Sequence, residues 1–219
     1  MNAVPFFSAF SVQDFLFMVQ GAGKTLWLTL WSGLAGTAIG LVVGWIRSIR
    51  FPVAAQLLAV YIDVIRTVPL IIQFILVNSG AAIAGMPLSP FATGILVLSL
   101  YMGGFVAEVV TAGIHAVPTR LRRAGRSLGL TYWQDLRYVV LPLSLRAVFP
   151  AWVGLLLGLM KDSSLIAVVG YIELLRASQI IINRTEQPLQ VLLGAGAFYF
   201  VMSFALSRSA AGIERRWKH

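Results

Sequence analysis

Residues 115–142, HAVPTRLRRAGRSLGLTYWQDLRYVVLP, form the one long polar interruption in a chain that is otherwise strongly apolar. We expect a first short helix over about residues 119–128, ended by Gly129 in the left-handed conformation. Thr131 followed by Gln134 has the spacing of a capping box and predicts the start of a second short helix. Pro142 marks the entry to the next apolar run. Arginines gather in or beside this stretch, namely Arg120, Arg122, Arg123, Arg126, Arg137 and Arg146. A basic helix–glycine–helix between two apolar runs indicates a docking element, not a catalytic centre.

Composition places the whole chain in the membrane. Its 219 residues are 58% hydrophobic and 11% charged, with a mean hydropathy of +0.85. An ordinary soluble domain cannot bury that much apolar surface, whereas lipid can surround it. The absence of cysteine excludes disulfides and thiolate metal sites. We therefore predict an all-α integral membrane protein consisting of a single domain, residues 1–219.

Five apolar runs are long enough to be membrane spans. They cover about residues 25–46, 54–77, 91–114, 143–160 and 189–206. Residues 1–20 are rich in aromatic side chains and lack the features of a cleavable signal, so we expect an amphipathic segment at the outer interface. In the first span, Gly36, Gly40 and Gly44 form a smooth face for close helix packing. Packing within the chain is favoured there over a subunit contact.

The distribution of basic residues predicts the topology. Twelve of the 17 Lys and Arg residues fall in two loops, at Arg146 and in the C-terminal tail. The positive-inside rule then places these segments in the cytoplasm, the N-terminus outside and the C-terminus inside. This topology accounts for the net charge of +9, so no nucleic-acid partner is expected.

Charged residues within the spans are candidates for a translocation path, because buried charge in a membrane is costly. Asp63 and Arg66 lie on one face of the second span, and Pro69 one turn later predicts a kink with free carbonyls. Glu108 lies near the end of the third span. Arg66 pairs with either Glu108 or Asp63 on this interpretation, and a structural ion pair is favoured over a direct role in transport.

The segment 161–188 is too polar for a simple span and is predicted to be a re-entrant or gating segment on the outer side. Two roles are open for Lys161 and Asp162. They could contact a zwitterionic solute, or they could form an ion pair with each other, which is slightly favoured. The chain has no pattern typical of a metal site or of a nucleophile with its base. We therefore favour a component of a transporter. The two alternative interpretations are a self-sufficient secondary transporter or channel, and a scaffold protein.

The run AGRSLGLTYWQDLRYVVLP (124–142) resembles the cytoplasmic EAA loop of ABC-importer permeases. Five further pieces resemble the polar amino-acid branch of that family, and they follow in the family's order. These are KTLWLTLWSGLAGTAIG (24–40), YIDVIRTVPLIIQF (61–74), FVAEVVTAGIHAVP (105–118), LMKDSSLIAVVGYIELLRASQ (159–179) and a terminal IERRW (213–217).

The resemblance implies a type I ABC importer permease fold in a bacterial cytoplasmic (inner) membrane. It implies a second permease, identical or homologous, around a path for a small polar solute. It also implies a cytoplasmic ABC ATPase dimer that binds residues 115–142, and a periplasmic or lipid-anchored solute-binding protein. The chain itself would then be no enzyme and hold no cofactor, since ATP and Mg belong to the ATPase.

The same resemblance implies two sets of site residues. For ATPase coupling they are Arg123, Ala124, Gly125, Leu128, Gly129 and Pro142. For the translocation path and gating they are Asp63, Arg66, Pro69, Glu108, Lys161, Asp162, Ser163 and Ser164. Arg123 stands where the loop has Glu, which implies docking against an acidic ATPase surface.

Overall fold

The computed structural model describes residues 10–49 and 52–217. Within these ranges every regular element is helical. Residues 1–9 of the predicted interfacial segment, and Arg50 and Lys218 of the predicted cytoplasmic charge, lie outside the described residues. The helices are α1 (Val12–Ser48), α2 (Pro52–Thr67), α3 (Leu70–Ile83), α4 (Pro90–Ala116), α5 (Thr119–Ser127), α6 (Tyr132–Asp135), a π-helical turn (Leu136–Val140), α7 (Leu141–Asp162), a 3-10 segment (Ser163–Val169), α8 (Leu174–Thr185) and α9 (Pro188–Trp217).

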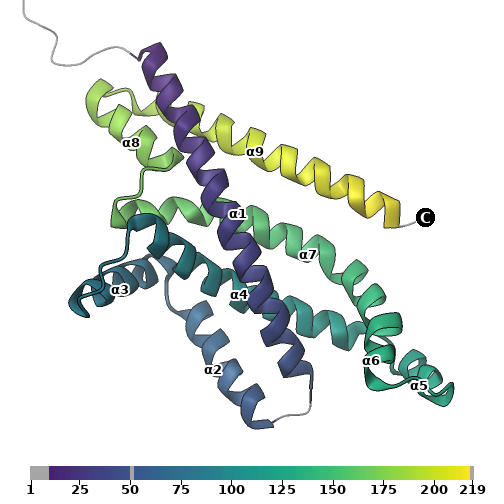
Figure 1. Cartoon of the computed structure of the whole chain (residues 1–219). Coiled ribbons are helices and arrows are strands. Elements are labelled where there is room, and N and C mark those ends of the chain that lie inside the picture. Colours follow the sequence, from purple (N-terminus) through teal and green to yellow (C-terminus); the bar gives the residue numbers. More distant parts are fainter. Residues whose placement is uncertain (1–9, 50–51, 218–219) are drawn as a thin grey trace, which may run out of the picture.

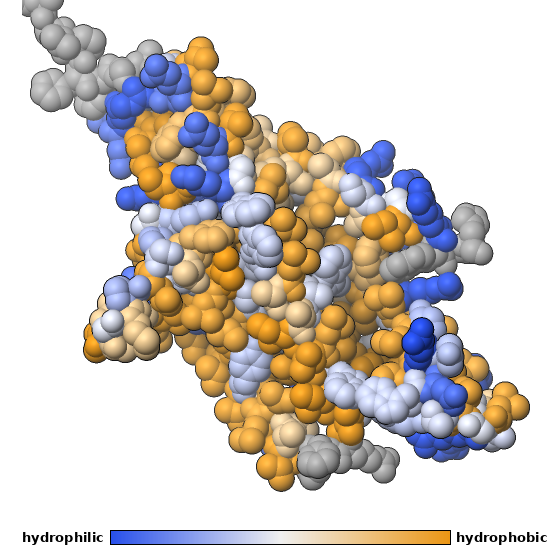
Figure 2. All heavy atoms as spheres, viewed as in Figure 1, coloured by the Kyte–Doolittle hydropathy of each residue, from blue (hydrophilic) through white to orange (hydrophobic). Residues whose placement is uncertain are grey.

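The prediction of an all-α membrane protein is confirmed. Four helical stretches are long and apolar enough to cross a membrane: Val12–Ser48, Pro90–Ala116, Tyr132–Val169 and Pro188–Arg216. A bent pair of helices brings the number of crossings to five if it counts as one span. Figure 2 shows a broad hydrophobic band between two hydrophilic ends of the molecule. One of these ends holds α5 and α6, and the other holds α8 and the start of α1 (Figure 1).

The glycine face of α1 packs within the chain, as predicted. Helix α4 lies against it so closely that a Cβ atom on Gly36 would be 2.6 Å from Cβ of Met102. A Cβ on Gly44 would be 2.7 Å from the carbonyl oxygen of Ala107. Contacts this short are impossible for a larger residue without moving backbone. The α1–α4 pair is therefore the closest-packed seam we describe, and other helices are arranged around it (Figure 1).

The predicted second span, about residues 54–77, corresponds to a pair of helices that is bent much more sharply than a kink at Pro69 would require. The chain bends by 107° between α2 and α3, at Pro69. Proline has no backbone N–H, so the carbonyl of Ile65 loses the donor that a helix would supply. The side-chain amide of Gln73 replaces it, donating to the carbonyl oxygens of Ile65 (2.9 Å) and Val68 (2.8 Å). The bend therefore has its own internal hydrogen bonds, and Pro69 breaks the span where only a kink was expected.

The boundaries of α1 and α7 also differ from those predicted. Helix α1 begins at Val12, capped by a Ser11–Asp14 capping box, so residues 12–20 belong to the same helix as the first span. The second short helix of the loop is continuous with α7 through the π-helical turn, so Pro142 lies near the start of α7 and not at a break.

The bend at Pro69 gives a test of these hydrogen bonds. Replacing Gln73 by Leu leaves two carbonyls without a donor, which we expect to lower the free energy of unfolding by ~1–3 kcal/mol. Gln56→Leu, at an exposed position of α2, is the matched control and is expected to have little effect. Equilibrium unfolding of the purified protein in detergent measures both. Equal stabilities of the two variants would contradict the role assigned to Gln73.

Candidate functional site

The basic loop, residues 115–142, contains a short helix that is braced against the rest of the chain. Helix α5 is followed by Gly129 at φ +84°, as the sequence predicted, and the N–H of Leu130 turns back to the carbonyl of Gly125 at 3.1 Å. Gly125 is buried, and a Cβ there would meet the side chain of Leu130 at 3.0 Å. Nε of Arg122 donates to Oδ2 of the buried Asp135 at 3.0 Å, which joins α5 to α6.

The outer side of α5 is free within the described part of the chain. Leu128 is 85% exposed and Leu121 43% exposed, and Ala124 lies between them on the same side of the helix. Arg123 is exposed beside them. An apolar stripe on an otherwise basic helix is unusual on a surface that meets only water. Of the predicted coupling residues, Arg123, Ala124 and Leu128 are exposed together, whereas Gly125 and Gly129 shape the backbone.

The start of the second helix is fixed by the predicted capping box. The N–H of Gln134 donates to Oγ1 of Thr131 (3.4 Å), and the N–H of Thr131 donates to Oε1 of Gln134 (2.8 Å). The π-helical turn then follows, closed by a bond from the N–H of Leu141 to the carbonyl of Leu136. Pro142 lies at the end of this turn, where the helix is wider than an α-helix and leaves room for the proline ring.

Arg66 forms neither of its two predicted ion pairs. Its guanidinium lies over the ring of Phe105, 5.4 Å from the ring centroid. Glu108 instead pairs with Arg47 at the end of α1, with Nη1 and Oε1 2.5 Å apart. Close packing of α1 on α4 explains the change of partner, because it brings Arg47 beside Glu108. Asp63 and Arg66 are exposed rather than buried, since no helix of the described chain covers that side of α2.

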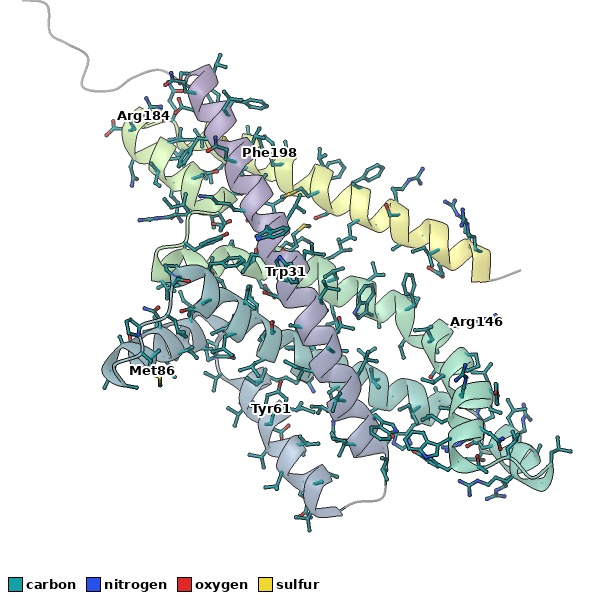
Figure 3. The ribbon with its side chains drawn as sticks, in the orientation of Figure 1. Trp31, Tyr61, Met86, Arg146, Arg184 and Phe198 are labelled. Atoms are coloured by element: carbon teal, nitrogen blue, oxygen red, sulfur yellow. The ribbon has the colours of Figure 1, made fainter. Side chains whose placement is uncertain are left out.

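Helix α2 is fastened to α4 by one polar contact that the sequence did not reveal. The hydroxyl of Tyr61 (Figure 3) donates to the carbonyl oxygen of Leu100 at 2.6 Å. This bond lies one and a half turns before Arg66. It holds the exposed Asp63–Arg66 side of α2 in a fixed direction, beside the aromatic residues of α4.

A small groove of about 100 Å³ lies between α4 and α7. Tyr101 and Phe105 line it from α4, and Gly154, Gly158 and Asp162 line it from α7. A Cβ on either glycine would touch nothing within 4 Å, so this side of α7 is open. No described part of this chain packs closely against Gly154 or Gly158. Asp162 lines this groove directly, whereas Arg66 does not line it and lies over the ring of Phe105, which forms part of its wall.

The remaining predicted path residues lie at the end of α7. Lys161 is exposed and Asp162 half-buried, and the described residues contain no ion pair between them. Adjacent residues on a helix point about 100° apart, which separates the two side chains. Ser163 is fully buried and donates to the carbonyl of Met160 at 2.8 Å, whereas Ser164 is half-buried. Pro69 is exposed at the bend.

Sequence reasoning missed a buried carboxylate at the other end of the molecule. Glu173 is fully buried and caps α8, accepting hydrogen bonds from the N–H groups of Leu175 and Arg176, each at 2.8 Å. The hydroxyls of Tyr199 (3.0 Å) and Thr25 (3.4 Å) complete the site. Burial raises the pKa of the Glu173 carboxyl, and these four hydrogen bonds partly offset the rise. The available signal was an acidic residue directly before an amphipathic helix, a common N-cap position.

The Glu173 site joins three helices, because Thr25 belongs to α1 and Tyr199 to α9. Arg184 of α8 also forms an ion pair with Asp14 of α1. The predicted gating segment, residues 161–188, is therefore a 3-10 segment, a left-handed Gly170 and a helix tied to its neighbours. Arg184 and Arg146 lie at opposite ends of the molecule (Figure 3).

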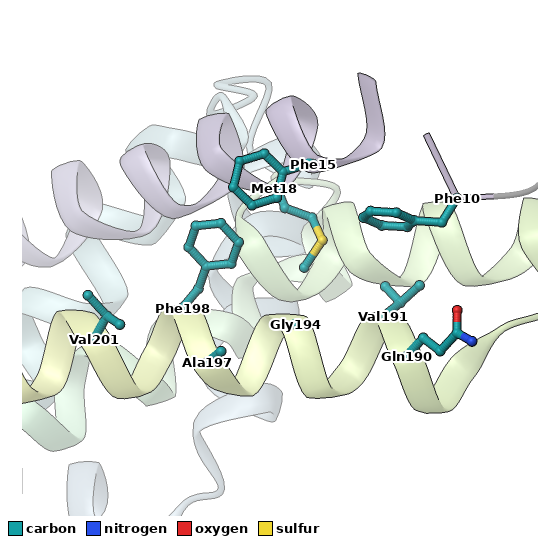
Figure 4. Close-up of a pocket in the computed structure, with 9 residues that line it drawn as sticks. All are labelled: Phe10, Phe15, Met18, Gln190, Val191, Gly194, Ala197, Phe198 and Val201. Atoms are coloured by element: carbon teal, nitrogen blue, oxygen red, sulfur yellow. The ribbon is translucent and has the colours of Figure 1, made fainter. Parts of the chain in front are cut away.

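A larger cavity of about 480 Å³ lies between the start of α1 and α9 (Figure 4). Its wall includes Phe15, Met18 and Phe198 and contains no charged side chain. It does not suit a polar solute, which needs hydrogen-bond partners. Among the described residues no group of three or more His, Cys, Asp and Glu side chains is placed to bind a metal ion.

Membrane-length helices, a charged groove open on one side and a braced basic helix at one end define a class of protein. They are the arrangement of a membrane permease that works with other subunits. Residues 36–219 match the family described as "Binding-protein-dependent transport system inner membrane component". The chain belongs to this family, the permease subunits of ABC importers. This confirms the predicted permease, as a multi-pass membrane subunit and not an enzyme.

Individual relatives agree over nearly the whole length. The glutamine transport system permease protein GlnP of Escherichia coli is 32% identical over 203 residues, 92% of this chain and 93% of the relative. The arginine transport system permease protein ArtQ of Bacillus subtilis is 27% identical over 213 residues, 97% of each.

Solved structures agree with the fold. A structure titled "Crystal structure of an amino acid ABC transporter with histidines" has a TM-score of 0.86 and 30% identity, covering 94% of this chain and 96% of its own. An inward-facing MetNI methionine ABC transporter has a TM-score of 0.82 at 23% identity, covering 95% and 99%, and supports the fold alone. The predicted type I importer permease fold is thus confirmed.

Glu173 gives the second prediction. In Glu173→Gln, an NH₂ group replaces a carboxylate oxygen and faces a donor, so we expect the free energy of unfolding to fall by ~1–3 kcal/mol. Glu186→Gln removes a charge at an exposed position of the same segment and is the control. Unfolding in detergent compares them. If Glu173→Gln were as stable as the control, Glu173 would not hold the three helices together.

Proposed function

We propose that this chain is the permease subunit of an importer that moves a polar amino acid, or a related small polar solute, across a bacterial inner membrane. The groove beside Phe105 carries this proposal. Asp162 supplies a carboxylate to this groove, and the Arg66 guanidinium lies over Phe105 in its wall, so an ammonium and a carboxylate group of one zwitterion would each have a partner of opposite charge nearby. Relatives named for glutamine, arginine and other amino acids support the same class of solute.

The path itself needs a second permease. A single chain leaves the Gly154–Gly158 side of α7 and the Asp63–Arg66 side of α2 uncovered. A second copy, or a homologous permease, closes the groove on that side. Lys161, Asp162, Ser163 and Ser164 then lie at one end of the path, with Arg66 and Pro69 beside its middle and Glu108 behind it, held by Arg47.

An ATPase dimer in the cytoplasm drives the cycle, and ATP and Mg bind there and not in this chain. The ATPase holds the exposed stripe of α5, with Arg123 against an acidic surface. A solute-binding protein delivers the solute at the opposite end, near α8. The clustering of arginines around α5 supports a cytoplasmic C-terminus and an outer N-terminus.

The coupling role of the loop predicts the effect of Gly129→Asp. Aspartate at φ +84° strains the turn by ~1–2 kcal/mol and tilts α5. We expect a membrane-inserted protein that no longer retains its ATPase during purification in mild detergent. Gly85→Asp, which puts the same residue at φ +74° between α3 and α4, is the matched control and is expected to retain it. Normal retention by Gly129→Asp would contradict the docking of this loop.

Reconstitution with the co-purified subunits tests the transport function. We expect ATP-dependent uptake of an amino acid, reduced at least about tenfold by Asp162→Asn and by Arg66→Gln, since a lost charge-assisted contact is worth ~1.5–3 kcal/mol. Arg216→Gln, at the exposed end of α9, is the control. Uptake by the chain alone without ATP would instead identify a self-sufficient secondary transporter or channel.

A further inference from the structure

Two adjoining cavities at the α5 end of the molecule differ sharply in chemistry. One, of about 350 Å³, lies between α1, α4 and α7, and its lining residues are aliphatic or aromatic except for Ser144. The other, of about 410 Å³, lies under α5 and is lined by Ser48, Arg122, Arg126 and Tyr132 among others. Ile114 and Leu136 line both cavities, so the two lie next to each other.

The order of the two cavities follows the axis of the helices. The apolar cavity borders Leu41, Val42 and Trp45 of α1, and the polar cavity borders Ser48 and Ile49 where α1 ends. One helical turn separates these positions. The space therefore runs from within the apolar band to its basic edge, in the direction in which a lipid lies in a leaflet (Figures 1 and 2).

Aromatic rings mark the junction between the cavities. The rings of Trp45 and Trp133 lie 5.7 Å apart, and those of Trp133 and Tyr132 lie 5.5 Å apart. Trp and Tyr concentrate where the acyl region of a membrane meets the headgroups. The indole nitrogen of Trp45 is buried and has no hydrogen-bond partner among the described residues. The rings of Trp45 and Trp133, which both line the apolar cavity, therefore suit the ester region of a lipid, between acyl chain and phosphate.

The polar cavity carries a net positive charge. Arg122 is paired through Nε with Asp135, and the rest of its guanidinium remains available to the cavity. Arg126 lies one turn further along α5 and forms no ion pair with an acidic side chain in the described parts of the chain. Two arginines against one carboxylate leave one positive charge, and no acidic residue lines the cavity itself.

We propose that this space binds one anionic phospholipid. Its acyl chain occupies the apolar cavity, and its phosphate lies between Arg122 and Arg126 with the Tyr132 hydroxyl. The proposal rests on the topology proposed above, which puts α5 at the cytoplasmic leaflet. There, anionic headgroups attract basic side chains next to membrane helices. A neutral lipid would fill the apolar half equally well but would leave the charge of Arg126 uncompensated.

The bound lipid would link the ends of α1 and α4 to α5. Arg122 and Arg126 point under α5, whereas Arg123 and the Leu121–Leu128 stripe point away from it. An ATPase on the outer stripe and a lipid on the inner side can therefore bind together. The lipid would limit how far α5 moves relative to the membrane, without touching the solute groove.

Lipid retention measured by native mass spectrometry tests the proposal. The permease is purified with its ATPase in mild detergent and exposed to phosphatidylglycerol or phosphatidylcholine. We expect one phosphatidylglycerol per permease, in preference to phosphatidylcholine. Arg126→Gln is expected to reduce its retention about fivefold, the effect of one basic residue at an anionic membrane surface. Val42→Trp, which fills the apolar cavity without altering charge, is expected to reduce it as well.

Arg120→Gln is the matched control, because Arg120 is exposed on α5 and points away from the cavity. An equal loss with Arg120→Gln would show general attraction to a basic surface and overturn the site. Equal retention of the two lipids would overturn the role of the phosphate. Displacement by excess inorganic phosphate would identify a free-anion site instead, and loss of lipid on ATPase binding would show that the ATPase fills the space. ATP-driven uptake, measured separately, remains the test of transport.

Discussion

The fold depends on how closely α1 can approach α4. Lipid offers no hydrophobic drive to bring two apolar helices together, so packing and polar contacts must do so. Glycines 36, 40 and 44 remove the side chains that would hold the backbones apart. At the end of this seam the Arg47–Glu108 pair forms, and Thr111 donates to the carbonyl of Gly44 at 3.3 Å. The positions of Phe105 and Tyr101 in the groove follow from the same placement of α4.

Backbone polar groups explain the features that look irregular. In a membrane an unsatisfied N–H or carbonyl is costly, so each break in a helix needs its own donor or acceptor. Gln73 supplies one at Pro69, Glu173 caps α8, and the Thr131–Gln134 box begins α6. Each of these side chains lies within eight residues of the group it serves. The bundle thus tolerates a 107° bend and a 3-10 segment without an open backbone.

Local sequence signals predicted the fold class, the left-handed Gly129, the capping box and the packing of the glycine face. These depend on short-range spacing, which a sequence displays directly. The partners of charged residues depend on which helices are neighbours, and that information is absent from spacing. Spacing therefore offered Glu108 or Asp63 as partners of Arg66, whereas in the structure Glu108 pairs with Arg47 of α1. Glu173 went unrecognised for the same reason, because Thr25 and Tyr199 lie 148 and 26 residues from it.

The π-helical turn between α6 and α7 has a mechanical consequence. Its hydrogen bonds span five residues and Pro142 contributes no donor, so the helix is weakened at this point. Force applied to α5 enters α7 through this turn. Because the weakened turn bends easily, a displacement of α5 along the membrane would change the tilt of α7. Gly158 and Asp162 lie at the far end of that helix, where a small angle produces the largest displacement.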